Sequence, residues 1–340
     1  MEENSLIISI VIPFYNVEQF ITECLYSVYN QDIPEDIYEV ICVNDASPDK
    51  TKDIVIEYQK THSNLILIEH ESNKKLGPAR NTGRSIAKGK YIWNVDSDDK
   101  IQPNVLSRII NICESNTLDV LIFNFDHFRN NNQILNASYP FVNSEVLNGI
   151  DFIKKFCLGK FGEISPIWTQ VYKREFLNNN NIFSPPINMG EDVPFTLKSL
   201  LLANRIKSIT DSCYIYRANE LSLGGEIEII PSAEKLYEKC FICSNHVLDT
   251  IRFIPKNEPL IKNEYLAITK YIISLFPSYI NRMSYLEYLK FKSACRKNVF
   301  QNLNLIMLLS NKNKILYINK VLFNFSQKYY AQNLHSNPRI

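Results

Sequence analysis

The sequence has little glycine, almost no net charge and no long apolar run. Its 340 residues include 9 glycines and carry a formal net charge of +1, so the overall balance indicates no particular kind of partner. No apolar run approaches the ~20 residues that a bilayer-spanning helix needs. The first residues, MEENSLIISI, carry acids where a secretory signal peptide needs positive charge. These absences predict a globular cytoplasmic protein.

Cysteine spacing gives no sign of a structural zinc site. The chain has 8 cysteines, and the only close pair is Cys240 and Cys243, with no second pair or histidine at zinc-finger spacing. Free thiols suit a reducing cytoplasm. No recognised nucleic-acid-binding module is present either, so no nucleic-acid partner is expected.

Strands and helices are expected to alternate over the first 125 residues. Short apolar runs predict strands over 6–12, 38–43, 65–69, 91–95 and 118–125, and helical spacing predicts helices over 17–29, 51–60 and 77–88. Later segments predict a helix over 192–202 and a strand over 212–217. This alternation is typical of a mostly parallel sheet covered on both faces, in which ligands bind beyond the carboxyl ends of the strands.

Three acids follow the fourth predicted strand, in the stretch YIWNVDSDDK. Asp96, Asp98 and Asp99 form a D-x-D-D pattern that can surround a hard divalent cation such as Mg²⁺ or Mn²⁺. The alternative is a helix N-cap before the helix that Pro103 opens. A calcium loop is excluded because Ile101 stands where glycine is required, and Lys100 replaces the threonine of a D-x-D-x-T phosphatase.

Two further groups of acids lie at the ends of predicted elements. Asp45, in VNDASPDKT, follows the second strand and can accept hydrogen bonds from a base or a ribose, or serve only as a turn residue. Glu191 and Asp192 open the predicted helix over 192–202. There they can cap the helix dipole, or one of them can act as a general base.

The ordered set SIVIPFYN, VICVNDASPDKT, LGPARNTGRSIAKGKYIWNVDSDD and MGEDVPF resembles the family 2 glycosyltransferases over roughly residues 5 to 220. The resemblance implies the inverting GT-A fold, an α/β fold with a mostly parallel central sheet flanked by helices, followed here by a C-terminal helical extension. It implies a catalytic domain over 1–225, with a nucleotide-sugar part over about 1–125 and an acceptor part over about 126–225. The remaining residues, 226–340, would form a basic, aromatic-rich helical region.

The resemblance also implies roles for individual residues. Those expected to border the nucleotide are Pro13, Tyr15, Asn16, Asp45 (on a uracil-type base), Arg80 and Asp96 (near the ribose). Asp98, assisted by Asp99, would hold Mn²⁺ or Mg²⁺ on the diphosphate. Glu191 and Asp192 match the family's ED pair, with Asp192 as catalytic base. Trp168 would line the acceptor side, the alternative being a core aromatic.

The C-terminal region differs in charge from the rest of the chain. From Gly225 onward it holds 16 Lys and Arg against 8 Asp and Glu, a net charge of +8, so the preceding residues carry −7. Basic helices with aromatic residues can lie on an anionic membrane. The alternative is a helical bundle that packs on the catalytic domain. The first hypothesis would place the enzyme peripherally on the inner leaflet.

These observations together predict a metal-dependent inverting glycosyltransferase with a UDP-linked donor. Its acceptor would be a hydroxyl of a glycan or of a lipid-linked saccharide in polysaccharide biosynthesis. A sugar-nucleotide nucleotidyltransferase is the first rival, but PFYNVEQF lacks the glycine-rich loop that it would need. A non-catalytic nucleotide- or glycan-binding module is the second, and the presence of both Asp98 and Asp192 argues against it.

Overall fold

The computed structural model describes residues 6–128, 134–136, 142–158, 166–186, 190–217, 246, 250–263 and 265. The chain divides into two compact units, one made of Met1–Ile230 and Glu238–Tyr279 and the other of Pro231–Tyr237 and Ile280–Ile340. All described residues belong to the first unit, and the following account concerns that unit alone.

The described strands and helices follow the predicted alternation closely. The strands are β1 (Ile8–Phe14), β2 (Tyr38–Asn44), β3 (Leu65–Glu69), β4 (Tyr91–Asn94), β5 (Lys100–Ile101), β6 (Val120–Phe128), β7 (Ile134–Asn136), β8 (Gln170–Lys173) and β9 (Ile206–Arg217). The helices are α1 (Ile21–Tyr29), α2 (Thr51–Gln59), α3 (Leu76–Ile86), α4 (Leu106–Ser115), α5 (Gly149–Phe152), α7 (Arg174–Asn179) and α8 (Asp192–Leu202). Short 3₁₀ turns at Glu35–Ile37 and Ile167–Thr169 and a π-helical turn at Ile153–Cys157 complete the set.

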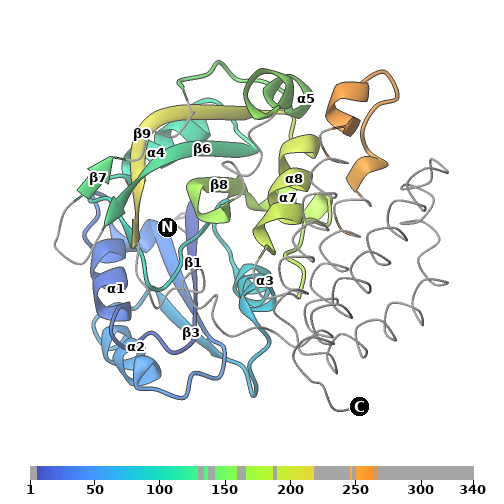
Figure 1. The fold of residues 1–340 in the computed structure, drawn as a ribbon. Coiled ribbons are helices and arrows are strands. Elements are labelled where there is room, and N and C mark those ends of the chain that lie inside the picture. The colour runs from blue at the N-terminus through green and yellow to red at the C-terminus, as the bar shows by residue number, and fades with distance from the viewer. Residues whose placement is uncertain are drawn as a thin grey trace, which may run out of the picture. The chain divides into compact units, whose positions relative to one another are not determined.

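All described strands join one sheet, in the order β3-β2-β1-β4-β8-β6-β9-β5, with β7 paired to β6 (Figure 1). The first four are parallel, so their carboxyl ends lie at one edge. Beyond β4, the antiparallel strand β8 makes the sheet mixed. The predicted α/β fold with a central sheet flanked by helices is confirmed.

The central strand β1 is buried on both faces because its residues alternate between two helical layers. Ile8, Ile10 and Ile12 pack in one core cluster with Leu25 of α1. On the opposite face, Val11 packs against Gly83 of α3. A Cβ added to Gly83 would sit 2.5 Å from a methyl carbon of Val11. Figure 1 shows α1 beside α2, with α3 apart from both. The strand ends that carry the polar residues are therefore held rigidly from two sides.

Two sheet features differ from the prediction in extent. The last strand begins at Ile206 rather than at residue 212, because its first half pairs in parallel with β6. Strand β8, which comes earlier in the chain than β9, was not expected as a strand. It lies between β4 and β6 in the sheet. Both strands gain their stability from long-range pairing, which the local sequence pattern does not reveal.

The region from residue 226 onward, which the sequence predicts to be helical and basic, lies mostly outside the described residues. Its described part belongs to the first unit: the Tyr265 hydroxyl donates to the Leu197 carbonyl of α8 at 2.7 Å, and Lys154 forms an ion pair with Glu258 at 2.5 Å. Within the described ranges, no helix combines the length and apolarity required to cross a bilayer.

Candidate active site

A single buried arginine gathers three acids that come from distant parts of the chain. Arg80 of α3 is 2% exposed. One guanidinium nitrogen, Nη2, donates to Asp96 at 2.6 Å, just beyond the end of β4. The other, Nη1, donates to Glu191 at 2.9 Å and to Asp192 at 2.6 Å, at the start of α8. Arg80 therefore joins the edge of the parallel sheet to the helix that carries the predicted base.

The cluster holds three acids and one arginine, and the pKa values of Arg80 and Asp192 are shifted. Burial acts to lower the pKa of Arg80, but the carboxylates of Asp192, Asp96 and Glu191 raise it well above its usual range. Burial raises the pKa of Asp192 to about 7, against the opposing effect of Arg80 and with the help of Glu191 and Asp96. Asp192 can therefore take up a proton near neutral pH, which is the property that a general base needs.

Asp99 is held by the last strand of the sheet. Its Oδ2 accepts from the Tyr214 hydroxyl at 2.7 Å and its Oδ1 from the backbone N–H of Arg217 at 2.7 Å. Burial, with Asp98 and Asp96 nearby, raises the pKa of Asp99 well above its usual range. The Arg217 side chain donates to the Asp98 carbonyl at 2.8 Å and to Glu23 at 2.9 Å. These bonds fix the backbone that presents Asp98.

Asp98 has the chemistry of a ligand for a hard cation. It is partly exposed, and burial, together with Asp96, raises its pKa to about 6. Proton release is favoured by a nearby cation, and the oxygen atoms at this strand end suit Mg²⁺ or Mn²⁺. Among the described residues, no three His, Cys, Asp or Glu side chains form a ready cation cage. A cation here would take most of its ligands from water and phosphate, as Mg²⁺ usually does.

Asp45 anchors the loop that follows β3. Its Oδ1 accepts from His70 Nδ1 at 2.7 Å and from the backbone N–H of Lys74 at 2.8 Å, and its Oδ2 accepts from the backbone N–H of Lys75 at 2.8 Å. His70 Nε2 lies 2.9 Å from the Thr82 hydroxyl of α3. Lys75 has φ +83°, a region that residues other than glycine rarely adopt. The acid therefore holds a strained backbone in place.

The end of β1 adds an exposed ring and a tight loop. Pro13 is buried opposite Val43 of β2. Tyr15 is 47% exposed, and Asn16 adopts φ +56°, with its backbone N–H donating to the Ser47 hydroxyl at 2.7 Å. Tyr15 therefore lies just beyond the carboxyl end of β1 with about half of its surface exposed.

Trp168 belongs to the aromatic core beneath the acids. It is 7% exposed and stacks on Tyr214 and Tyr216, with ring centroids 4.4 and 5.4 Å away, while Phe125 meets it edge-on at 4.7 Å. The backbone N–H of its neighbour Ile167 donates to Asp192 Oδ2 at 3.3 Å. This packing agrees with the core alternative and gives the segment a supporting position beside Asp192.

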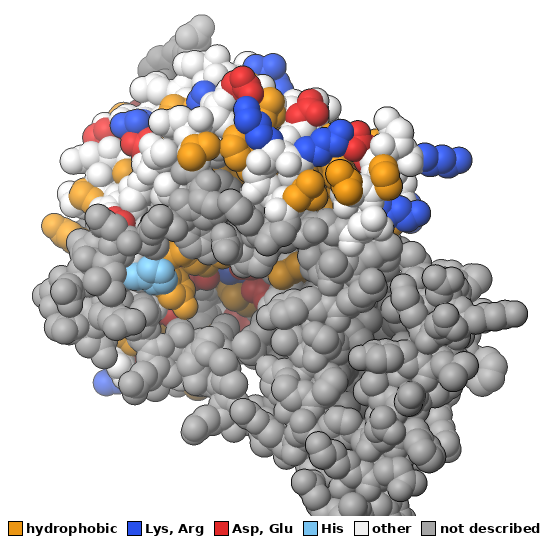
Figure 2. Space-filling view, turned by 45° about the horizontal axis from the view of Figure 1, so that its top comes forward, with side chains coloured by type: hydrophobic (Ala, Val, Ile, Leu, Met, Phe, Trp, Pro, Cys, Tyr) orange, Lys and Arg blue, Asp and Glu red, His pale blue; other side chains and the backbone are white. Residues whose placement is uncertain are grey.

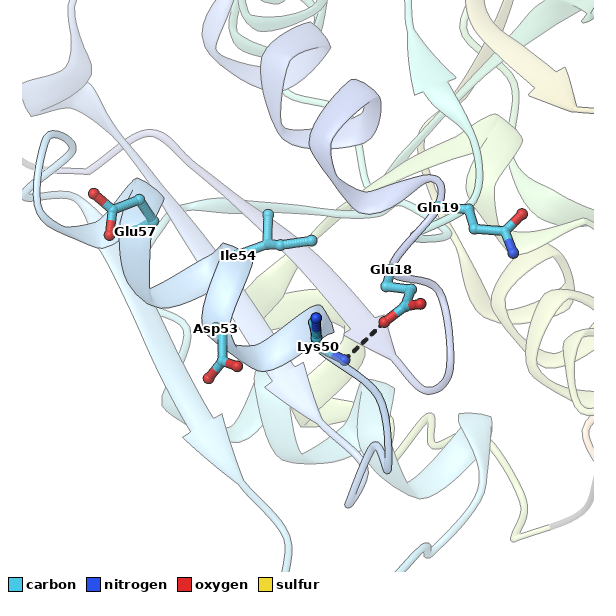
Figure 3. A pocket seen from close by; sticks show the side chains of 6 residues that line it. All are labelled: Glu18, Gln19, Lys50, Asp53, Ile54 and Glu57. Atoms are coloured by element: carbon cyan, nitrogen blue, oxygen red, sulfur yellow. Dashed lines mark hydrogen bonds between the residues drawn. The ribbon is translucent and has the colours of Figure 1, made fainter.

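Figure 2 shows acidic side chains (red) beside hydrophobic side chains (orange) on the face that it presents. An open depression of about 470 Å³ lies between the start of α1 and helix α2 (Figure 3). It is lined by Glu18, Gln19, Lys50, Asp53, Ile54 and Glu57. None of the predicted site residues lines this depression.

The structure brings together four of the predicted residues, Arg80, Asp96, Glu191 and Asp192. Sequence analysis did not identify His70, Tyr214 or Arg217 as site residues. His70 directly follows the third strand, and the rule that ligands bind at strand ends would have found it. Tyr214 and Arg217 lie within and at the end of β9, where nothing in the local sequence points to the acids they contact.

Comparison with known proteins gives consistent results. The family model for glycosyl transferase family 2 matches residues 9–184. The uncharacterized glycosyltransferase EpsJ of Bacillus subtilis is 32% identical over 239 residues, which is 68% of this chain and 67% of that protein. The poly(ribitol-phosphate) beta-glucosyltransferase of Bacillus spizizenii is 36% identical over 62% of this chain, but the match spans only 32% of that longer protein. The crystal structure of Staphylococcus aureus TarS 1–349 in complex with UDP-GlcNAc superposes with a TM-score of 0.68 at 25% identity, covering 85% of this chain and 79% of that one.

Proposed function

Because the chain belongs to glycosyl transferase family 2, we propose that it is an inverting, metal-dependent enzyme that moves a sugar from a UDP-linked donor to a hydroxyl of a glycan. The observation that carries the proposal is the bridge of Arg80 between Asp96 and Asp192. Asp96 stands at the strand edge where a nucleotide is expected, and Asp192 is the candidate base. One guanidinium thus connects the expected donor side of the site, at Asp96, with the expected acceptor side, at Asp192. A displacement reaction must align these two sides.

Asp192 would act on the acceptor. Its carboxylate takes the proton from an acceptor hydroxyl while that oxygen forms a bond to the anomeric carbon of the donor sugar. The bond between that carbon and the diphosphate oxygen breaks from the opposite face, and the electron pair leaves with the nucleoside diphosphate. One displacement inverts the anomeric configuration, and no covalent sugar–enzyme intermediate is formed. Because burial raises its pKa to about 7, Asp192 is a stronger base than an ordinary carboxylate and can accept the proton near neutral pH.

Asp98 would hold a divalent cation, and Asp99 would keep Asp98 in place. A Mn²⁺ or Mg²⁺ ion supplies positive charge to the departing diphosphate oxygens. We assign Asp99 a supporting role because both its oxygens accept hydrogen bonds, from Tyr214 and from Arg217. Asp45 and Tyr15 would meet the nucleobase, one by hydrogen bonding and the other by stacking.

The relatives suggest the substrates. UDP-GlcNAc is bound in the TarS structure, and the Bacillus spizizenii relative is named for glucosyl transfer to poly(ribitol phosphate). A hexose or N-acetylhexosamine donor and a cell-surface glycan or lipid-linked acceptor are therefore proposed. The net charge of +8 beyond residue 224 would favour work at an anionic membrane surface, and co-sedimentation of the full chain with anionic vesicles, compared with neutral vesicles, tests this.

The decisive experiment is a donor panel with matched variants. Wild-type protein, Asp192→Asn and Asp53→Asn are incubated with UDP-glucose, UDP-GlcNAc and GDP-mannose, with Mn²⁺ or with a chelator. We expect UDP release from one UDP-sugar that needs Mn²⁺, is lost in Asp192→Asn and is retained in Asp53→Asn, an exposed acid of the unrelated depression. Unchanged UDP release by Asp192→Asn would contradict the proposed base.

A further inference from the structure

The carboxylate of Asp45 is almost fully committed before any ligand arrives. An ionised carboxylate offers about four acceptor directions, two on each oxygen. Among the described residues, His70 and Lys74 occupy both directions of Oδ1, while Lys75 occupies one direction of Oδ2. One direction, on Oδ2, is left. Asp45 is 3% exposed, so only a group that reaches into the sheet edge can use it.

His70 is held as firmly as the acid it contacts. The ring is buried at 8% exposure, and its backbone N–H donates to the Asn44 carbonyl at 2.9 Å. Its Nδ1 faces a carboxylate that only accepts, so Nδ1 carries the proton and donates. The Thr82 hydroxyl, 2.9 Å from Nε2, fixes the other side of the ring. His70 cannot turn away from Asp45 without breaking contacts on both of its ring nitrogens.

We infer that His70 is a specificity-determining residue, which fills Oδ1 of Asp45 so that the acid accepts one N–H from the nucleobase of the donor and not two. The inference rests on the proposed function, since it concerns the nucleotide of that donor. His70 acts through Asp45 and does not touch the reacting atoms.

Uracil and guanine differ in the number of adjacent N–H donors, and this difference predicts which base Asp45 prefers. Uracil presents one imide N–H, flanked by two carbonyl oxygens, and one free acceptor satisfies it. Guanine presents a ring N–H beside an amino N–H, and two adjacent carboxylate oxygens suit that pair. With Oδ1 filled by His70 and Lys74, guanine would leave one buried donor unpaired, which carries a penalty. The geometry therefore selects uridine over guanosine diphosphates.

The test compares two substitutions of His70 with a control histidine. His70→Leu removes the donor, whereas His70→Asn keeps an amide N–H near the position of Nδ1. His62→Leu removes another paired histidine, which contacts Glu35 at 2.9 Å on the side of α2. Calorimetric titration with UDP and with GDP, each with Mn²⁺, gives the ratio of the two Kd values. Thermal melts confirm that each variant is folded.

We expect wild type to bind UDP at least about tenfold more tightly than GDP, the effect of about one unpaired hydrogen bond. His70→Leu should lose most of that ratio, while His70→Asn and His62→Leu keep it within about threefold. If folded His70→Leu keeps the wild-type ratio, or weakens both nucleotides equally, His70 is only structural and the inference is wrong. If wild type binds neither nucleotide, the proposed function fails as well, so the two failures are distinguishable.

Discussion

Replacing Arg80 by glutamine should move the acid side of the pH–rate profile upward. Glutamine keeps a polar amide of similar reach but removes the charge that faces Asp192 at 2.6 Å. The ionised form of the base then loses its closest stabilising cation, while Glu191 and Asp96 still oppose ionisation. More of the enzyme is protonated at Asp192 at a given pH, and the rate falls in proportion.

The size of the shift can be worked from the geometry. Unit charges about 4 Å apart interact by about 4 kcal/mol at the effective dielectric constant of about 20 that suits protein sites. That energy corresponds to about 3 pKa units. It is an upper bound, because the Asp192 side chain is 21% exposed and water can partly replace the lost charge. We expect the midpoint of the acid limb to rise from about 7 in wild type by 1 to 3 units, in order of magnitude.

The assay is UDP release at saturating donor and acceptor, followed from about pH 5 to about pH 10 for folded variants. Arg84→Gln is the matched control, because Arg84 is one turn further along α3, is also buried, and contacts the Ile182 carbonyl and the Phe183 ring instead of acids. Arg80→Lys keeps the charge and should shift the midpoint less than Arg80→Gln. An acid limb that stays at its wild-type position in Arg80→Gln would refute the reasoning, as would an equal shift in Arg84→Gln.

Three further changes test other parts of the site. Asp98→Asn should weaken UDP binding at least tenfold in Mn²⁺ and leave it unchanged in chelator, as measured by calorimetry; an equal loss in both conditions would contradict a role in metal binding. Tyr214→Phe removes the hydroxyl that donates to Asp99 and should lower the free energy of unfolding in urea by about 1.5 to 3 kcal/mol, whereas no change would show that the bond is weak. Gly77→Ala would place a Cβ 2.2 Å from the Pro185 carbonyl oxygen, so we expect a loss of about 1 to 3 kcal/mol in the same assay, and a stabilised variant would show that the contact relaxes freely.

Much of the sheet and part of the site could be predicted from the sequence, for physical reasons that differ. Three of the four parallel strands, β1, β2 and β4, are short and buried throughout, and the edge strand β3 is a partly buried run of leucine and isoleucine, so hydrophobicity alone marks them. The acids after β2 and β4 were located because polar residues that directly follow a buried strand must lie at the sheet edge. Family motifs then indicated roles that spacing alone left open.

The side chains that contact those residues could not be predicted from the sequence. Arg80 was expected near the nucleotide, but its contacts with Asp96, Glu191 and Asp192 were not predicted; the last two acids lie more than 100 residues away along the chain. Tyr214 reaches Asp99 over a similar separation. Such contacts depend on how β8 and β9 join the sheet, and local propensity carries no information about strand order.

Helix α3 contacts both halves of the site, and this restricts how the chain can change in length. Arg80 reaches the acids, Thr82 meets His70, and Asn81 bonds with the backbone of Ser184. One residue inserted near the start of the helix would rotate everything after it by about 100° and move it by about 1.5 Å. All three contacts would fail together. Insertions between Gly77 and Thr82 should therefore abolish folding or activity.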